Sequence, residues 1–133
     1  MKVLIVDDNP HEARLLRQAM ETVAMVEFTH IAEGSEAIAL LSSMEPSRFD
    51  LILLDWKLLG IQGDQLAKVY LSRPDRDPRI PLVFTSSAIP PDIQFQLQQL
   101  GCTVLTKPMD LEGYDEMAIR LTAICAEARR LSV

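Results

Sequence analysis

Cysteine is scarce in this sequence, and its positions exclude a metal site built on thiolates. Cys102 and Cys125 are the only two cysteines, and neither has a closely spaced partner. Structural zinc sites need four ligands in close pairs, and His11 and His30 add no such pattern. We therefore expect two small buried thiols in a reducing compartment, and histidines on the surface or on an edge strand.

Long apolar runs are also missing, which excludes a membrane-spanning helix. The strongest run is only Leu51 to Leu54, whereas a span needs about 18 consecutive apolar residues. The first six residues lead directly into two aspartates, without the long apolar stretch and cleavage site of a signal peptide. We expect a cytoplasmic protein without a membrane partner.

Positive charge is in the minority, and glycine-rich loops are missing. Thirteen lysines and arginines stand against nineteen acids, giving a net charge of −6, and Arg129-Arg130 is the only adjacent basic pair. Binding a nucleic-acid backbone requires clustered basic residues, so we expect no nucleic-acid partner for this domain. The five glycines form neither the Gly-Lys-Ser/Thr loop nor the glycine fingerprint of nucleotide-binding enzymes, which argues against both classes.

Short apolar runs alternate along the chain with longer segments of helical periodicity. The runs are rich in Val, Ile and Leu, which is typical of buried parallel strands. We predict strands at 3–6, 26–31, 51–54, 82–84 and 103–105. We predict helices where apolar residues recur at spacings of three and four, at 10–22, 35–44, 62–71, 92–100 and 111–131.

The ends of the predicted helices carry their own signals. Asn9 and Pro10 suit the start of the first helix, with Glu12 placed to complete a capping box, and Gly101 suits the end of the fourth. Strict alternation predicts a doubly wound parallel sheet with helices on both faces. The second run is the least continuous, which suits an edge strand. We therefore predict a single α/β domain over residues 1–133, flavodoxin-like, with five strands in the order 2-1-3-4-5 and five helices.

Polar side chains follow the carboxyl ends of four of the five predicted strands. Open α/β sheets bind their ligands at this edge. Acids follow the first and third strands, hydroxyls follow the fourth, and a Lys-Pro pair follows the fifth. In chain order these residues are Asp7, Asp8, Asp55, Thr85, Ser86, Ser87, Lys107 and Pro108.

Taken singly, each of these residues has a simpler explanation. Asp7 and Asp8 suit helix capping, although Asn9 already fills that position. Asp55 suits a turn, yet an acid directly after an apolar strand is unfavourable unless it is paired or solvated. Ser86 alone is an ordinary loop hydroxyl. The complete set is what makes the pattern specific.

Three carboxylates held close together repel one another and raise each other's pKa values. A divalent cation relieves that repulsion, and Mg²⁺ prefers a few carboxylate oxygens while it retains water. A carboxylate in such a site can attack phosphorus and form an aspartyl phosphate. The metal and a lysine would then neutralise charge on the phosphoryl oxygens.

In order and spacing, these residues resemble the receiver domain of two-component systems over essentially the whole chain. The resemblance implies that Asp55 accepts a phosphoryl group. It implies that Asp7, Asp8 and Asp55 hold Mg²⁺ together with the backbone carbonyl of Lys57. It further implies phosphoryl contacts from Lys107 and from the backbone N–H of Trp56, and a cis peptide bond between Lys107 and Pro108.

The resemblance also implies a switch hydroxyl after the fourth strand. Counting five residues from Pro81 selects Ser86, with Ser87 at the small-residue position and Thr85 as the second choice. The family often has an aromatic residue three positions before the lysine, where this chain has Val104. The usual coupling between hydroxyl and aromatic is therefore in question.

The implied function is that of a phosphorelay signalling domain, and no enzyme activity is expected beyond self-catalysed phosphotransfer and slow autodephosphorylation. The implied partners are a sensor histidine kinase or phosphotransfer protein and a downstream protein. A phosphatase of the haloacid-dehalogenase type needs a second acid two residues after the nucleophile, where Lys57 stands. A phosphorylation-independent receiver-like binding module remains the alternative, although every acid is retained.

The last predicted helix, 111–131, is longer than any predicted strand, and its apolar surface is broad. An outer flank is formed by Met117, Ile124 and Leu131 at seven-residue spacing. One interpretation packs the whole width on the sheet and the first helix. The other makes the flank a surface for a partner or for a homodimer.

Overall fold

The computed structural model describes residues 1–43, 48–59 and 61–131, without the side chains of residues 59, 61, 62, 64 and 131. Five strands form one parallel sheet in the order β2-β1-β3-β4-β5, so the predicted fold and strand order are confirmed. The strands are β1 (Lys2–Val6), β2 (Glu27–Ile31), β3 (Leu51–Asp55), β4 (Leu82–Ser86) and β5 (Thr103–Thr106).

In the described residues, six helices connect or follow the strands, one more than the sequence predicted. The additional helix is α3, which has four residues and begins directly after Asp55. A single turn is too short to leave a periodic apolar pattern, so sequence periodicity could not reveal it. The helices are α1 (Pro10–Glu21), α2 (Gly34–Ser43), α3 (Trp56–Leu59), α4 (Ile61–Leu71), α5 (Pro91–Gln99) and α6 (Leu111–Leu131). The predicted end of the second helix, Met44, lies outside the described residues.

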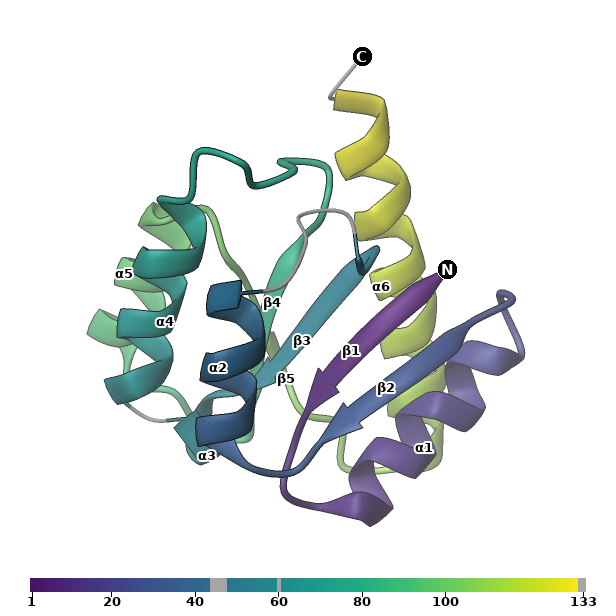
Figure 1. Ribbon diagram of the computed structural model, residues 1–133. Coiled ribbons are helices and arrows are strands. Elements are labelled where there is room, and N and C mark those ends of the chain that lie inside the picture. The colour runs from purple at the N-terminus through teal and green to yellow at the C-terminus, as the bar shows by residue number, and fades with distance from the viewer. Residues whose placement is uncertain (44–47, 60, 132–133) are drawn as a thin grey trace.

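The helices cover the sheet on both faces (Figure 1): α1 and α6 lie on one side, and α2, α4 and α5 lie on the other. Alternate residues of each strand enter two separate cores. In β3, Leu51 and Leu53 pack on the α1–α6 side, whereas Ile52 and Leu54 pack on the opposite side. Because strand side chains alternate with a period of two, Asp55 continues the series that faces α1 and α6.

Hydrogen bonds at two helix ends fix the loops that border the sheet. The Asn9 side chain accepts from the N–H groups of His11 and Glu12 at 3.0 and 3.2 Å, as predicted for an N-cap. The predicted capping box is wrong, because the Asn9 N–H donates to Asp7 Oδ1 at 2.8 Å instead of to Glu12. At the end of α5, Gly101 adopts φ of 95°, a left-handed conformation in which a glycine is unstrained.

The outer flank of α6 differs from one of the two predictions. Met117 is only 7% exposed and belongs to the core between α6, α1 and the sheet, so its predicted place on an open surface is wrong. Ile124 is partly buried against the same core, and the side chain of Leu131 lies outside the described part. The helix α1 packs against α6. It covers part of the apolar surface of α6 that the sheet alone would leave exposed. None of the described helices is both long and apolar enough to cross a membrane.

Candidate functional site

Three carboxylates meet at the carboxyl edge of the sheet. Oxygens of Asp7, Asp8 and Asp55 all lie within 4.8 Å of one another. The Asp7 N–H donates to the Ile31 carbonyl at 3.0 Å, so Asp7 extends the pairing of β1 with β2 by one residue. Asp7 and Asp55 are buried and Asp8 is exposed. The predicted convergence of the three acids is confirmed.

Lys107 reaches this cluster from the end of β5. Its backbone N–H donates to the Ser86 carbonyl at 2.9 Å, which fixes the lysine next to β4. Its ammonium nitrogen lies 3.3 Å from Asp7 Oδ2 and 3.2 Å from Asp55 Oδ2. A third acceptor, Glu12 Oε2, is closer at 2.6 Å. The sequence spacing predicts a helix-capping role for Glu12 and gives no sign of this contact.

The electrostatics of the cluster follow from burial and from these contacts. Burial raises the pKa of Asp7, and the Asn9 N–H and the Lys107 charge offset that rise only in part. Burial lowers the pKa of Lys107, but the hydrogen bond to Glu12 and the charges of Asp7 and Asp55 outweigh it and raise the pKa above its ordinary value. The lysine is therefore a permanent cation at physiological pH.

The carboxylate set suits a hard divalent cation. Such cations bind oxygen ligands, and three mutually close carboxylates are relieved of repulsion when one binds. Asp8 is exposed, so the cluster is open to solvent on one side. Asp55 Oδ1 accepts the Lys57 N–H at 3.0 Å, which holds the start of α3 against the cluster. These residues can therefore hold a divalent metal ion.

The last two residues of β4, Thr85 and Ser86, carry hydroxyls that lie on opposite faces of the sheet. Thr85 pairs in register with Asp55 and, together with Lys107, lines a small cavity on the side of α1 and α6. Ser86 continues the series of Phe84, which packs on the other side together with Val104. The Ser86 hydroxyl donates to the Ala88 carbonyl and accepts from the Ala88 N–H, both at 3.0 Å. Ser87 is exposed.

Two further features concern the surroundings of the cluster. The Lys107–Pro108 peptide bond is trans, so the predicted cis bond is wrong. Trans is the lower-energy form of an X–Pro bond.

His30 Nε2 lies 2.7 Å from the Asp7 carbonyl oxygen. Because that oxygen only accepts, Nε2 must carry the hydrogen, and His30 thereby tethers Asp7 from the edge strand. The sequence predicted the edge strand but carried no signal for this bond.

Comparison with known proteins assigns this arrangement to a family. Residues 3–118 match the sequence model of the response regulator receiver domain. The chain belongs to the response regulator receiver family. This receiver domain is 31% identical to the phosphate regulon transcriptional regulatory protein PhoB of Pseudomonas aeruginosa, over 92% of the chain and 50% of PhoB. Among the curated relatives, it spans between 6% and 78% of their own length.

Solved structures agree with the assignment. The phosphorylated cyanobacterial phytochrome response regulator RcpA has a TM-score of 0.73 at 31% identity, covering 88% of the receiver domain and 87% of that chain. The Mn²⁺-bound form of the response regulator Rcp1 has a TM-score of 0.75 at 26% identity, covering 92% and 91%. The chain is therefore a receiver domain of two-component signalling, which is a signalling domain.

Proposed function

We propose that this receiver domain takes a phosphoryl group on Asp55, with Mg²⁺ held by Asp7, Asp8, Asp55 and the backbone carbonyl of Lys57. One observation carries the proposal: three carboxylates offer oxygens within 4.8 Å of one another at the sheet edge. Lys107 contacts two of them, which places a fixed positive charge beside the acceptor. A cluster of hard oxygen donors with an adjacent ammonium suits both Mg²⁺ and a phosphoryl group.

The proposed donor is the phosphohistidine of a sensor histidine kinase or a phosphotransfer protein. An oxygen of Asp55 attacks phosphorus, the new O–P bond forms as the P–N bond breaks, and the imidazole nitrogen leaves with the electron pair of that bond. Lys107 and the Trp56 N–H contact the phosphoryl oxygens, and the Ser86 hydroxyl moves to reach one of them. When bound, Mg²⁺ supplies positive charge to the same oxygens.

The chemistry stops at the phosphorylated domain and its slow hydrolysis. A dehalogenase-type phosphatase would need a carboxylate at position 57, and Lys57 cannot serve as one. The phosphorylated state then alters binding to a downstream protein. Cys102 and Cys125 are both buried, as expected of small apolar side chains in a reducing compartment, and we propose a cytoplasmic location.

Acetyl phosphate tests the proposed function without the natural partner. Incubated with acetyl phosphate and Mg²⁺, the wild-type chain should gain one phosphoryl mass by intact mass spectrometry, and the same mixture with excess EDTA should give none. Peptide mapping should place the modification on the segment that contains Asp55. A chain that stays unmodified under conditions that label an established receiver domain would favour the phosphorylation-independent binding module.

Removing Asp8 should have opposite effects without and with metal. In EDTA, Asp8→Ala should be more stable than the wild type by about 1 kcal/mol, because it relieves repulsion among the carboxylates. In Mg²⁺, the variant should lose most of the stabilisation that the metal gives the wild type. Thermal melting measures both, with the exposed Asp92→Ala as control. Lower stability in EDTA with an unchanged Mg²⁺ response would contradict the assignment of Asp8.

Amide exchange can show whether Ser86 or Thr85 is the hydroxyl that couples phosphorylation to a conformational change. Ser86→Ala should still take up the phosphoryl group, but it should lose most of the phosphorylation-dependent change in amide exchange over residues 88–99. Thr85→Ala should retain that change, because Thr85 faces α1 and α6, whereas α5 lies on the opposite side of the sheet. Each variant is compared with its own unphosphorylated form, since Ser86→Ala also removes two bonds to Ala88. The reverse pattern would make Thr85 the switch hydroxyl.

A further inference from the structure

Glu12 uses the ammonium group that a phosphoryl group on Asp55 would need. A lysine ammonium has three N–H donors, and Lys107 has three carboxylate acceptors within hydrogen-bond distance. The contact with Glu12 is 2.6 Å, whereas those with Asp7 and Asp55 are 3.3 and 3.2 Å. To contact new phosphoryl oxygens, Lys107 must therefore redirect donors away from carboxylates, and Glu12 holds it most closely.

Local structure explains why Glu12 is available to Lys107. It is the third residue of α1, where a glutamate ordinarily accepts from the N-cap N–H. Here Asp7 Oδ1 already accepts from the Asn9 N–H at 2.8 Å, so the Glu12 carboxylate is left to bind elsewhere. The Asn9 side chain in turn accepts from the Glu12 N–H at 3.2 Å, which fixes the start of the helix beside the cluster.

Position on the sheet brings Glu12 to the same side as the reacting groups. Glu12, Asp7, Thr85 and Lys107 line one small cavity between the sheet, α1 and α6. The Glu12 and Lys107 side chains are 32% and 16% exposed, so their ion pair is partly screened by solvent. Glu12 also differs from Asp55 in one respect: phosphorylation converts the Asp55 carboxylate into an acyl phosphate, whereas the Glu12 carboxylate is unchanged and keeps its negative charge.

We propose that Glu12 competes with the phosphoryl group on Asp55 for Lys107, and so acts as a positioning residue that lowers the stability of the phosphorylated state. This inference rests on the proposed function. With Glu12 in place, Lys107 is divided between a resident carboxylate and the incoming oxygens. When Glu12 has no charge, Lys107 has one competitor fewer and turns further toward the phosphoryl group.

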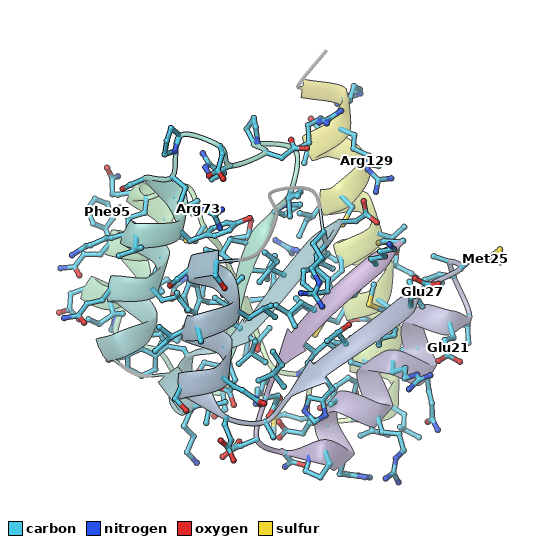
Figure 2. All side chains as sticks on the ribbon, viewed as in Figure 1. Glu21, Met25, Glu27, Arg73, Phe95 and Arg129 are labelled. Atoms are coloured by element: carbon cyan, nitrogen blue, oxygen red, sulfur yellow. The ribbon has the colours of Figure 1, made fainter. Side chains whose placement is uncertain are left out.

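The test replaces the charge and keeps the shape. Glu12→Gln is compared with the wild type in binding of beryllofluoride, a phosphoryl mimic, at saturating Mg²⁺. Trp56 is the single tryptophan and adjoins Asp55, so its fluorescence reports binding; fluorine NMR of bound beryllofluoride gives an independent measure. Glu12→Gln should bind roughly fivefold tighter, the size of one partly screened ion pair. Glu21→Gln, at the far end of the same helix (Figure 2), should bind like the wild type.

A second comparison shows whether Glu12 acts through Lys107. In the Lys107→Met background, Glu12→Gln should give no further gain in beryllofluoride affinity. A gain of the same size without the lysine would mean direct repulsion between Glu12 and the phosphoryl group, and would overturn the competition. Titration with Mg²⁺ alone should give Glu12→Gln an affinity equal to or weaker than that of the wild type. A higher Mg²⁺ affinity in the variant would explain tighter beryllofluoride binding without any competition for Lys107, and would overturn the proposal.

The outcomes separate this inference from the proposed function. If the wild-type chain binds no beryllofluoride in Mg²⁺ by either measure, the proposed function fails and the role of Glu12 fails with it. If the wild type binds beryllofluoride and Glu12→Gln binds it equally or more weakly, the proposed function stands and the competition is overturned.

Discussion

Asp55→Asn should gain no phosphoryl mass from acetyl phosphate and Mg²⁺ under conditions in which the wild-type chain gains one. An amide lacks the anionic oxygen that attacks phosphorus, so labelling should fall to background. The substitution preserves shape, and the amide oxygen can still accept the Lys57 N–H. A time course by intact mass spectrometry measures the rate.

A matched variant separates the loss of the nucleophile from the loss of a charge. Asp50 lies next to the other end of β3, where it accepts from the Lys2 N–H and contacts Arg129. Asp50→Asn should be labelled at close to the wild-type rate. Undiminished labelling of Asp55→Asn would mean that another residue is the acceptor.

Lys107→Met should be less stable than the wild type by about 3 kcal/mol in EDTA, because it leaves buried carboxylates without their cation. The Asp55 and Asp7 side chains are only 2% and 9% exposed, so solvent replaces the lost charge poorly. Methionine retains most of the length and apolar surface of the lysine. Urea denaturation in EDTA measures the free energy of unfolding.

Metal provides the internal check on this prediction. Mg²⁺ should restore a larger share of stability to Lys107→Met than it adds to the wild type, because it neutralises the same carboxylates. Lys57→Met is the control, since the Lys57 side chain is exposed beside the same site, and such changes usually stay within about 0.5 kcal/mol. If Lys107→Met were as stable as the wild type in EDTA, the three lysine contacts would contribute little to folding.

The sheet and its acidic edge could be predicted because both depend on local patterns. Every residue of β3 and β4 is buried, and a strand covered on both faces appears in a sequence as an unbroken apolar run. The carboxyl ends of parallel strands share one edge, so Asp7 and Asp55, which lie at the ends of the neighbouring strands β1 and β3, are expected to approach one another once the strand order is known. Their convergence needed no side-chain detail.

Other features depend on how distant segments meet, and local patterns do not encode that. Glu12 and Lys107 are 95 positions apart, and the spacing that suggested a capping box gave no sign that Asp7 would take the Asn9 N–H instead. For Met117, periodicity gave the width of the apolar surface of α6. It did not show that α1 would cover the part of that surface on which Met117 lies. The bond from His30 to the Asp7 carbonyl likewise requires the register of β2 against β1.

The helix α5 is held to the rest of the molecule by little buried surface. All nine of its residues are described, and Leu97 is its one fully buried side chain, whereas α1 buries four. Phe95 points away from the sheet on α5 (Figure 2) and is 61% exposed. One buried leucine contributes about 1.5–3 kcal/mol, so local unfolding of α5 requires far less free energy than global unfolding. The segment that follows Ser86 is thus the one whose detachment disturbs the two cores least.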